Sequence, residues 1–157
     1  MRILNYLLLA GIFLMACNPG SKQSDETTIE TSQPVLTDSV KDGVFIHITE
    51  SYNDPHRVLM PLKMATMMAK DKDVLIYLDI HAVELVTKTS KDMEYADFTP
   101  LKKMLQDLID AKVGIYACPT CMKISNIKPE DLIDGVKVAE KEKFFNFTNG
   151  KIITLDY

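Results

Sequence analysis

From Gly43 onward, short β-rich runs alternate with segments of helical periodicity, and this alternation restricts the fold more than any other feature. The first two β-type runs are residues 43–48 and 74–78. Between them, residues 56–70 carry apolar side chains at spacings of three and four, which predicts a helix with one apolar face. Strands that alternate with helices predict a mostly parallel sheet covered on both faces. We therefore expect an α/β fold, a three-layer α/β/α sandwich with about five strands.

The rest of the folded segment continues the same pattern. Thr99-Pro100 begins a helix whose apolar residues again recur at helical spacing. The stretch 80–98 fits neither period, and we expect a long loop there with a short element around 82–86. The other expected elements are strands at 113–117, 135–138 and 151–155 and short helices at 129–133 and 139–147.

The first 16 residues have the properties of an export signal rather than of a folded domain. Arg2 supplies a positive start, and residues 3–15 are apolar except for Asn5. The tetrapeptide Leu14-Met15-Ala16-Cys17 resembles a bacterial lipobox, in which the cysteine is acylated and becomes the mature N-terminus. We expect Cys17 to be lipidated; a plain signal peptide with an incidental cysteine is the alternative.

The segment after Cys17 has the composition of a linker. Residues 18–42 are dominated by Ser, Thr, Gln, Asp and Glu and hold too few large apolar residues to fold alone. We therefore divide the chain into a signal peptide (1–16), a lipidated cysteine with a flexible tether (17–42) and an α/β domain (43–157). This organisation predicts a location in the bacterial cell envelope, lipid-anchored to a membrane, with the domain outside the cytoplasm.

The stretch YACPTC, residues 116–121, carries the strongest chemical signal. Cys118 ends a predicted strand, and Pro119 suits the first turn of a helix, so a thiolate there would face unpaired backbone N–H groups. Cys121 lies one helical turn further on, close enough to resolve a mixed disulfide. We expect Cys118 to be the nucleophile and Cys121 the resolving thiol. Two buried structural cysteines are the alternative.

Several other functions fit the sequence less well. A thioredoxin-like domain carries its CxxC motif after an early strand, whereas here the motif follows three strands. A zinc site needs four ligands, and neither a second CxxC nor histidines at ligand spacing are present among His47, His56 and His81. Since no glycine-rich phosphate fingerprint follows a strand, we expect no nucleotide cofactor. A net charge of -4 without a basic cluster argues against nucleic-acid binding.

Polar residues in two loops are candidates to line the site. In open α/β sheets, ligands bind beyond the carboxyl ends of the strands. The loops that follow the first two strands leave the sheet in that direction. The substrate-binding candidates, chosen by loop position only, are Glu50, Tyr52, Asn53 and His81.

Four methionines on the first predicted helix could either bind a metal or pack in the core. Soft thioether ligands can bind copper(I), whereas methionine also fills irregular cores readily. We expect packing or an oligomer contact rather than copper capture, and predict no metal site. The residues concerned are Met60, Met64, Met67 and Met68.

The folded part, Gly43–Tyr157, resembles the DsrE/DsrF-like family of small α/β sulfur-relay proteins. The resemblance rests on the segments PHRVLMPLKMATMMAK and MKISNIKPEDLIDGVKVAE, and on the strand VGIYAC, which ends at a cysteine before a helix. It implies that Cys118 is the sulfur-accepting residue and that the protein forms homo-oligomers, commonly trimers or hexamers. The partners it implies are a sulfur donor and acceptor, or a thiol protein.

Three hypotheses about function follow. The first is a membrane-tethered sulfur-handling domain that carries persulfide sulfur or exchanges thiols and disulfides through its CPTC motif, with carriage and exchange both left open. The second is a non-catalytic oligomeric binding module at the cell envelope. The third is capture of a soft metal, copper or zinc.

Overall fold

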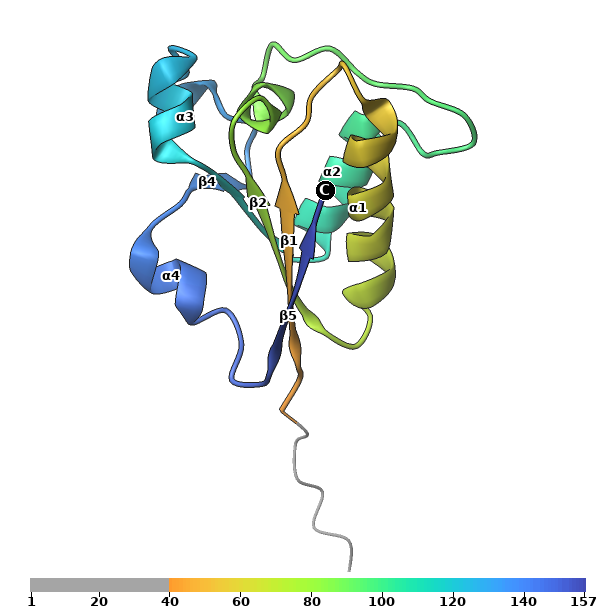
Figure 1. Cartoon of the computed structure of the whole chain (residues 1–157), viewed down its shortest axis with the longest axis vertical. Coiled ribbons are helices and arrows are strands. Elements are labelled where there is room, and N and C mark those ends of the chain that lie inside the picture. Colours follow the sequence, from red (N-terminus) through yellow and green to blue (C-terminus); the bar gives the residue numbers. More distant parts are fainter. Residues whose placement is uncertain (1–39) are drawn as a thin grey trace, which may run out of the picture. The chain divides into compact units, whose positions relative to one another are not determined.

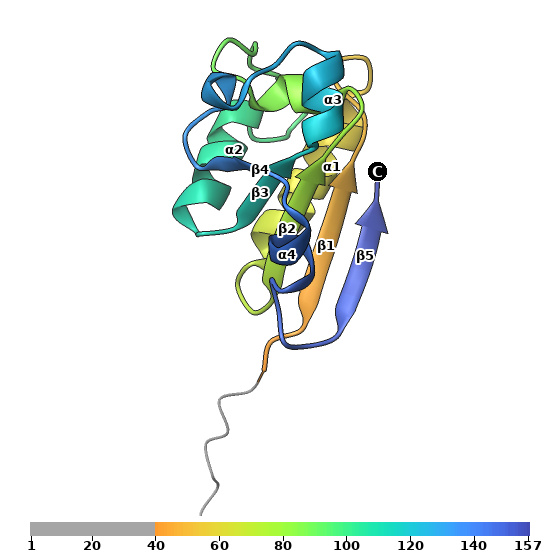
Figure 2. The same ribbon diagram turned by 90° about the vertical axis from the view of Figure 1, so that its left-hand side faces the viewer.

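A computed structural model of the chain describes residues 40–157, apart from the side chain of Phe145. It confirms the expected α/β fold, with five parallel strands in the order β4-β3-β2-β1-β5 (Figures 1 and 2). The segments 1–16 and 17–39, which include Cys17, lie outside the described residues. The strands are β1 (Gly43–Ile48), β2 (Asp73–Leu78), β3 (Gly114–Ala117), β4 (Val136–Val138) and β5 (Ile152–Asp156).

Helices cover the two faces of the sheet unequally. Helices α1 (Pro55–Met68) and α2 (Leu101–Asp110) lie on one face, and the shorter α3 (Pro119–Ile124) and α4 (Lys141–Phe145) on the other (Figure 1). Two 3₁₀ turns complete the order, η1 (Ala82–Val86) and η2 (Pro129–Asp131). Within residues 40–157, none of the helices is both long enough and apolar enough to cross a membrane.

The core lies between the sheet and helices α1 and α2. On β1, Val44, Ile46 and Ile48 are buried, whereas Phe45 and His47 between them are only partly buried. This alternation follows from the strand period of two, which places successive side chains on opposite faces. Since α3 has six residues and α4 five, they cover only part of the second face. The three-layer prediction therefore holds with a thin second helical layer.

Local boundaries differ from the sequence expectation mainly in the last third of the domain. The segment expected to be a helix at 129–133 is the single turn η2, and the helix expected at 139–147 is shortened to α4. The expected element around 82–86 is present as η1. Segments this short gain little from helical propensity, so packing contacts decide their length.

Candidate functional site

The two cysteines lie where β3 ends and α3 begins. Cys118 is the residue before the first turn of α3, and its backbone N–H donates to Leu78 O of β2 at 2.9 Å. Pro119 at the first helical position has the fixed φ that a helix start requires. Cys121 lies one turn on, and its Sγ accepts a hydrogen bond of 3.1 Å from the Ile80 N–H. Both thiols are free and partly buried.

The surroundings of the two thiols shift their pKa values in opposite directions. Burial raises the pKa of Cys118, but hydrogen bonds from the Tyr77 hydroxyl and the Cys121 backbone N–H outweigh it, and the pKa lies below its ordinary value. Burial raises the pKa of Cys121, and its hydrogen bond to Cys118 raises it further. Cys118 is therefore the thiol that ionises first, and a thiolate is the nucleophilic form of cysteine.

Tyr77 on β2 is the side chain outside the CPTC motif that acts on Cys118. It is in register with Tyr116 of β3, two residues before Cys118, so the side chains of Tyr77 and Cys118 share one face of the sheet. Burial raises the pKa of Tyr77, and donation of its proton to Cys118 raises it further, so the phenol stays protonated. A phenol held in this state is a hydrogen-bond donor to a thiolate.

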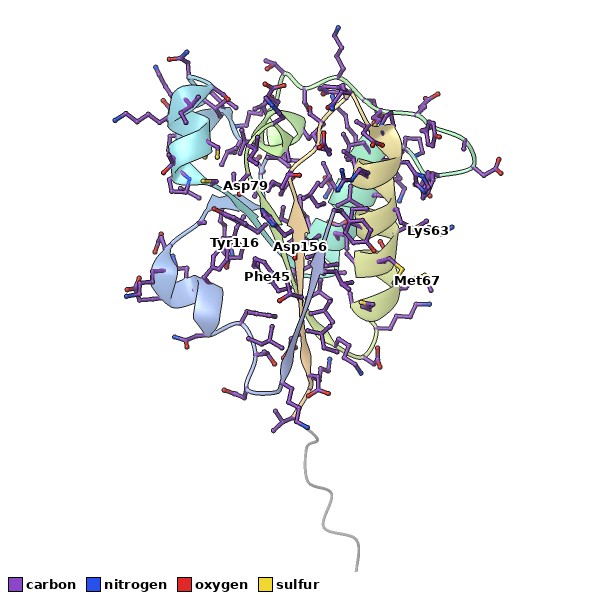
Figure 3. All side chains as sticks on the ribbon, viewed as in Figure 1. Phe45, Lys63, Met67, Asp79, Tyr116 and Asp156 are labelled. Carbon is purple, nitrogen blue, oxygen red and sulfur yellow. The ribbon has the colours of Figure 1, made fainter. Side chains whose placement is uncertain are left out.

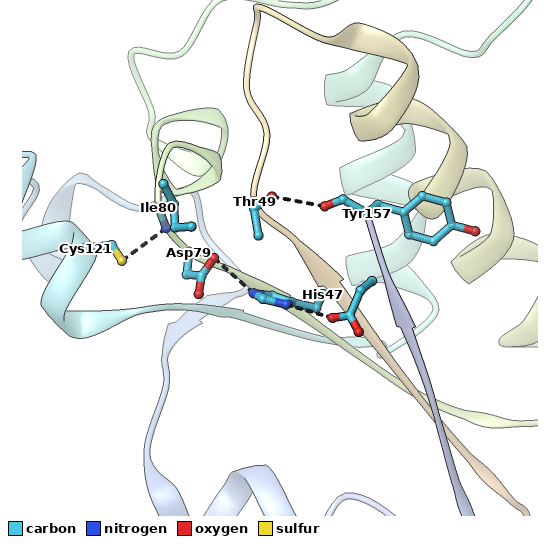
Figure 4. A network of polar contacts seen from close by, with 7 residues as sticks. His47, Thr49, Asp79, Ile80, Cys121 and Tyr157 are labelled. Atoms are coloured by element: carbon cyan, nitrogen blue, oxygen red, sulfur yellow. Dashed lines mark hydrogen bonds and ion pairs between the residues drawn. The ribbon is translucent and has the colours of Figure 1, made fainter.

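A chain of polar contacts runs from the cysteines across the sheet to β5 (Figure 4). His47 Nε2 lies 3.0 Å from Asp79 Oδ1, and His47 Nδ1 lies 2.9 Å from Asp156 Oδ1. The atoms His47 Nε2 and Asp79 Oδ1 are buried and lack a well-aligned hydrogen bond, so their approach is a close polar contact that becomes an ion pair only when His47 is protonated. Asp79 directly precedes Ile80, whose N–H contacts Cys121.

Aromatic rings pack against the residues of this polar chain. His47 stacks on Tyr77 with ring centroids 5.6 Å apart, and Phe144 of α4 meets Tyr77 edge-on at 4.7 Å. Phe45 and Tyr116 complete this aromatic cluster around Phe144. Figure 3 shows Phe45, Tyr116, Asp79 and Asp156 together on the side of the sheet that faces α3 and α4. The cluster fixes the orientation of Tyr77 and His47.

The four loop candidates gather beside the cysteines rather than around them. Tyr52, Asn53 and His81 line a shallow hollow of about 280 Å³ with Ser51 and Glu84. Glu50 does not line it but accepts a hydrogen bond of 2.8 Å from Asn53 Nδ2. Neither Cys118 nor Cys121 lines this hollow, so these residues belong to a neighbouring surface. Their role as a substrate site stays a prediction.

Four residues of the polar chain and the aromatic cluster lie outside the candidates that the sequence nominated. The contacts of His47 come from β2 and β5, which no local spacing reveals. The usable signal was the alternation on the strands, where polar and aromatic residues occupy the face opposite the aliphatic core. The residues concerned are His47, Tyr77, Asp79 and Asp156.

Among residues 40–157, no group of three or more His, Cys, Asp or Glu side chains is arranged to hold a metal ion. The two carboxylates at His47 lie on opposite ring nitrogens and do not converge on a common point. The methionines of α1 are split, since Met67 is 56% exposed, whereas Met68 packs against the core. The described residues therefore offer the cysteine pair as their reactive groups.

Comparison with known proteins identifies the family of this chain. The sequence profile of the DsrE/DsrF-like family matches residues 42–152, which is well over half of the chain. The chain belongs to the DsrE/DsrF-like family. Membership indicates a role related to sulfur relay. No curated protein matches this DsrE/DsrF-like chain in sequence.

Two solved structures resemble the DsrE/DsrF-like domain. The crystal structure of the ychN protein from E. coli has a TM-score of 0.59 at 21% identity, covering 73% of this chain and 99% of that one. A protein of unknown function from Methanobacterium thermoautotrophicum, MTH1491, has a TM-score of 0.53 at 20% identity, covering 73% of this chain and 100% of its own. At such identities the similarity establishes the fold.

Proposed function

We propose that this DsrE/DsrF-like domain handles sulfur through Cys118, with Cys121 as the resolving thiol. The observation that carries the proposal is the contrast between two thiols one helical turn apart, since the pKa of Cys118 is lowered and that of Cys121 is raised. Thiolates attack sulfur and thiols do not, so this difference in pKa determines which cysteine reacts first. Cys118 reacts first, and Cys121 reacts with whatever Cys118 has bound.

Persulfide carriage is the reaction that family membership favours. The Cys118 thiolate attacks the outer sulfur of a persulfide donor, the donor's S–S bond breaks, and the donor leaves as a thiolate. Cys118 then holds one additional sulfur atom. An acceptor thiolate attacks that atom, and Cys118 leaves as a thiolate again. Each transfer forms one S–S bond and breaks one, so no external oxidant or reductant is needed.

Dithiol exchange is the second candidate, and the position of Cys121 one turn from Cys118 favours it. Here Cys118 opens a partner disulfide, and Cys121 releases the partner by closing a bond to Cys118. An exported location would supply disulfide substrates, because oxidising compartments maintain them.

Intact-mass analysis separates these reactions. All samples carry Cys17→Ser. After exposure to inorganic polysulfide, we expect the chain with both Cys118 and Cys121 to gain the mass of whole sulfur atoms, Cys118→Ser to gain none, and Cys121→Ser to keep the gain. After exposure to glutathione disulfide, dithiol exchange converts the chain with both cysteines to an internal disulfide, whereas Cys121→Ser accumulates the glutathione adduct. Sulfur loading that persists undiminished in Cys118→Ser would contradict the assignment of the nucleophile.

We also propose that the domain is held at a bacterial membrane by acyl chains on Cys17. Support comes from the sequence Leu14-Met15-Ala16-Cys17 and from the linker composition of residues 18–42. Multiple acyl chains anchor a protein far more firmly than the marginal binding of one. Mass analysis of the N-terminal peptide from membranes tests this, with an acylated Cys17 expected and Cys17→Ser found in the soluble fraction.

Self-association is a further part of the proposal, as a trimer or hexamer. It is supported by the family resemblance and by exposed apolar side chains at the sheet edge, where Ile152 is 47% and Ile153 57% exposed. Ile152 and Ile153 point to opposite faces of β5, so each face of this edge strand offers an exposed apolar side chain to a partner. Sedimentation of the purified chain measures the state directly, and Ile153→Asp is expected to shift it toward monomer.

A further inference from the structure

A thiol that reacts second needs a way to lose its proton. Burial is the largest cause that raises the pKa of Cys121, and it persists when Cys118 is bound in a mixed disulfide, whereas attack on sulfur requires the thiolate. In many enzymes a positioned carboxylate or histidine accepts such a proton. The polar chain that leaves Cys121 toward β5 contains both kinds of group.

We propose that Asp79 and His47 form a proton-accepting pair for Cys121, and that Asp156 connects this pair to solvent. This inference rests on the proposed function, because it concerns the second step of sulfur exchange at Cys118. Asp79 and His47 have no part in the family resemblance drawn from the sequence, and they enter on their geometry alone.

Position is the first argument for the pair. The side chains of His47, Tyr77 and Asp79 alternate onto the same face of the sheet as Cys118. Asp79 precedes Ile80, whose N–H donates to Cys121 Sγ at 3.1 Å, and the Asp79 carboxylate contacts His47 at 3.0 Å (Figure 4). The negative charge of Asp79 is felt at Cys121, where it helps to raise the pKa of the thiol.

The gradient of exposure is the second argument. The side chain of Asp79 is 20% exposed, that of His47 25%, and that of Asp156 70%. Two short contacts, 3.0 Å and 2.9 Å long, therefore lead from the partly buried Asp79 through His47 to the exposed Asp156. Protein packing alone does not require a histidine with a carboxylate at each ring nitrogen, and such an arrangement is suited to passing a proton.

Three titratable side chains are in electrostatic contact with Asp79. The titratable side chains that interact with it are His47 from β1, Tyr77 from its own strand and Cys121 from α3, with Cys118 next to Tyr77. Tyr77 is a donor to Cys118 and stays protonated. His47 is thus the group through which a proton on Asp79 can move on.

The step balances as an exchange. Cys118 holds a partner sulfur in a mixed disulfide, and the Cys121 proton passes to the Asp79 carboxylate. Cys121 Sγ attacks Cys118 Sγ, a bond forms between them, and the bond from Cys118 to the partner sulfur breaks with its electron pair on the partner. The partner leaves as a thiolate. The two cysteines are oxidised by two electrons, and the partner disulfide is the oxidant.

The test uses a disulfide whose two halves report separately. The full chain carries Cys17→Ser in every variant, so that Cys118 and Cys121 are its thiols. Dithiobis(nitrobenzoate) releases one coloured thiolate when Cys118 attacks it and a second when Cys121 resolves the adduct. We expect Asp79→Asn and His47→Gln each to slow the second release about tenfold or more at neutral pH and to leave the first within about twofold.

Two readouts separate proton transfer from a structural effect. Added acetate or imidazole should restore the second release in Asp79→Asn, and a rise in pH should narrow its gap from the wild type. Asp156→Asn should slow the step only about threefold, since water can replace an exposed carboxylate. Asp71→Asn, on the exposed turn before β2, is the matched control and should change neither release.

Different results would overturn the proton-accepting pair and the proposed function. A second release that is unchanged in both variants, or one slowed without any rescue by buffer or pH, overturns the proton-accepting pair. Loss of the first release in the wild type would instead overturn the assignment of Cys118 and with it the proposed function. Should Asp79→Asn fail to fold, His47→Gln supplies the same comparison.

Discussion

Tyr77 is the residue whose hydroxyl most directly controls the charge on Cys118. It lies on the neighbouring strand and donates to the thiol, and this hydrogen bond offsets part of the effect of burial. The same bond keeps the phenol protonated. Two residues distant in sequence thus stabilise one ionised state, and changing one should move the titration of the other.

Replacement of Tyr77 by Phe removes the hydroxyl and keeps the ring. Because a hydrogen bond to a charged group is worth about 1.5–3 kcal/mol before solvent screening, we expect the pKa of Cys118 to rise and its alkylation by iodoacetamide near neutral pH to slow roughly threefold to tenfold. The midpoint of the alkylation rate should move to higher pH. Tyr116→Phe is the control, and equal slowing in both variants would argue against the bond.

Ile80 is strained in a way that bears on the same site. It has a φ of +49°, a left-handed conformation that a β-branched residue rarely adopts, and its side chain is 52% exposed. In this conformation its N–H reaches Cys121. The strain is tolerated where it positions a backbone donor on a reactive sulfur.

Ile80→Gly should therefore stabilise the domain. We expect the free energy of unfolding to rise by about 1 kcal/mol, because glycine adopts this conformation without a steric penalty and little packing is lost. Urea denaturation provides the measurement. Ile124→Gly is the contrast, since Ile124 is 76% exposed on a helix, and it should lower stability by about 0.5 kcal/mol. Destabilisation by Ile80→Gly would contradict the strain.

Among the elements, α4 is joined to the sheet through the ring of Phe144. It spans five residues, too few to be stable as an isolated helix, and Phe144 joins it to the rings of Tyr77 and Phe45. At its first turn, Lys143 forms an exposed ion pair with Glu140, 3.0 Å long. An exposed pair of this kind adds little stability.

Phe144→Ala should release α4 without unfolding the sheet. We expect the amide hydrogens of Lys143 and Phe144 to lose their protection, because the ring contacts that hold the helix are gone, whereas those of α1 keep theirs. Hydrogen exchange followed by mass spectrometry resolves the two regions. Phe147→Ala, beyond the helix, is the comparison. Retained protection in α4 would mean that its backbone contacts suffice.

At this scale the sequence predicts long elements better than short ones. The periodicity of residues 56–70 and the β-rich runs at 43–48 and 74–78 locate α1, β1 and β2 within a few residues. These segments are long enough for the pattern to be read locally. The extents of η2 and α4 depend on distant packing partners, and so does the meeting of His47 with Asp156 across 109 residues. The cysteine pair was predictable because both residues belong to one motif.

On the scale of the whole domain, one continuous core joins the sheet to α1 and α2. Leu105 of α2 is 1% exposed within it. Since domains of this size have a total stability of about 5–15 kcal/mol, a single core cavity removes a large share. Core substitutions should therefore act on every element together and on the site as well.

Leu105→Ala should lower the free energy of unfolding by about 2–5 kcal/mol through lost burial and the cavity left behind. Urea denaturation followed by circular dichroism measures the change. Met67→Ala is the control, because Met67 on the outer side of α1 is 56% exposed (Figure 3), and it should have little effect. Similar losses for the two variants would contradict the location of the core.

The strand order also bears on the time course of assembly. Strand β1 pairs with β2 across one helical crossover, but with β5 across nearly the whole domain, so the second pairing closes a far longer loop. We infer that β1 pairs with β5 later than with β2. The contacts of this edge with β1 include the Tyr157 N–H, which donates to His47 O at 3.0 Å. Each brief detachment of β5 would expose one side of His47 to water while β1, β2 and β3 remain paired. His47 would then exchange protons with solvent during these openings.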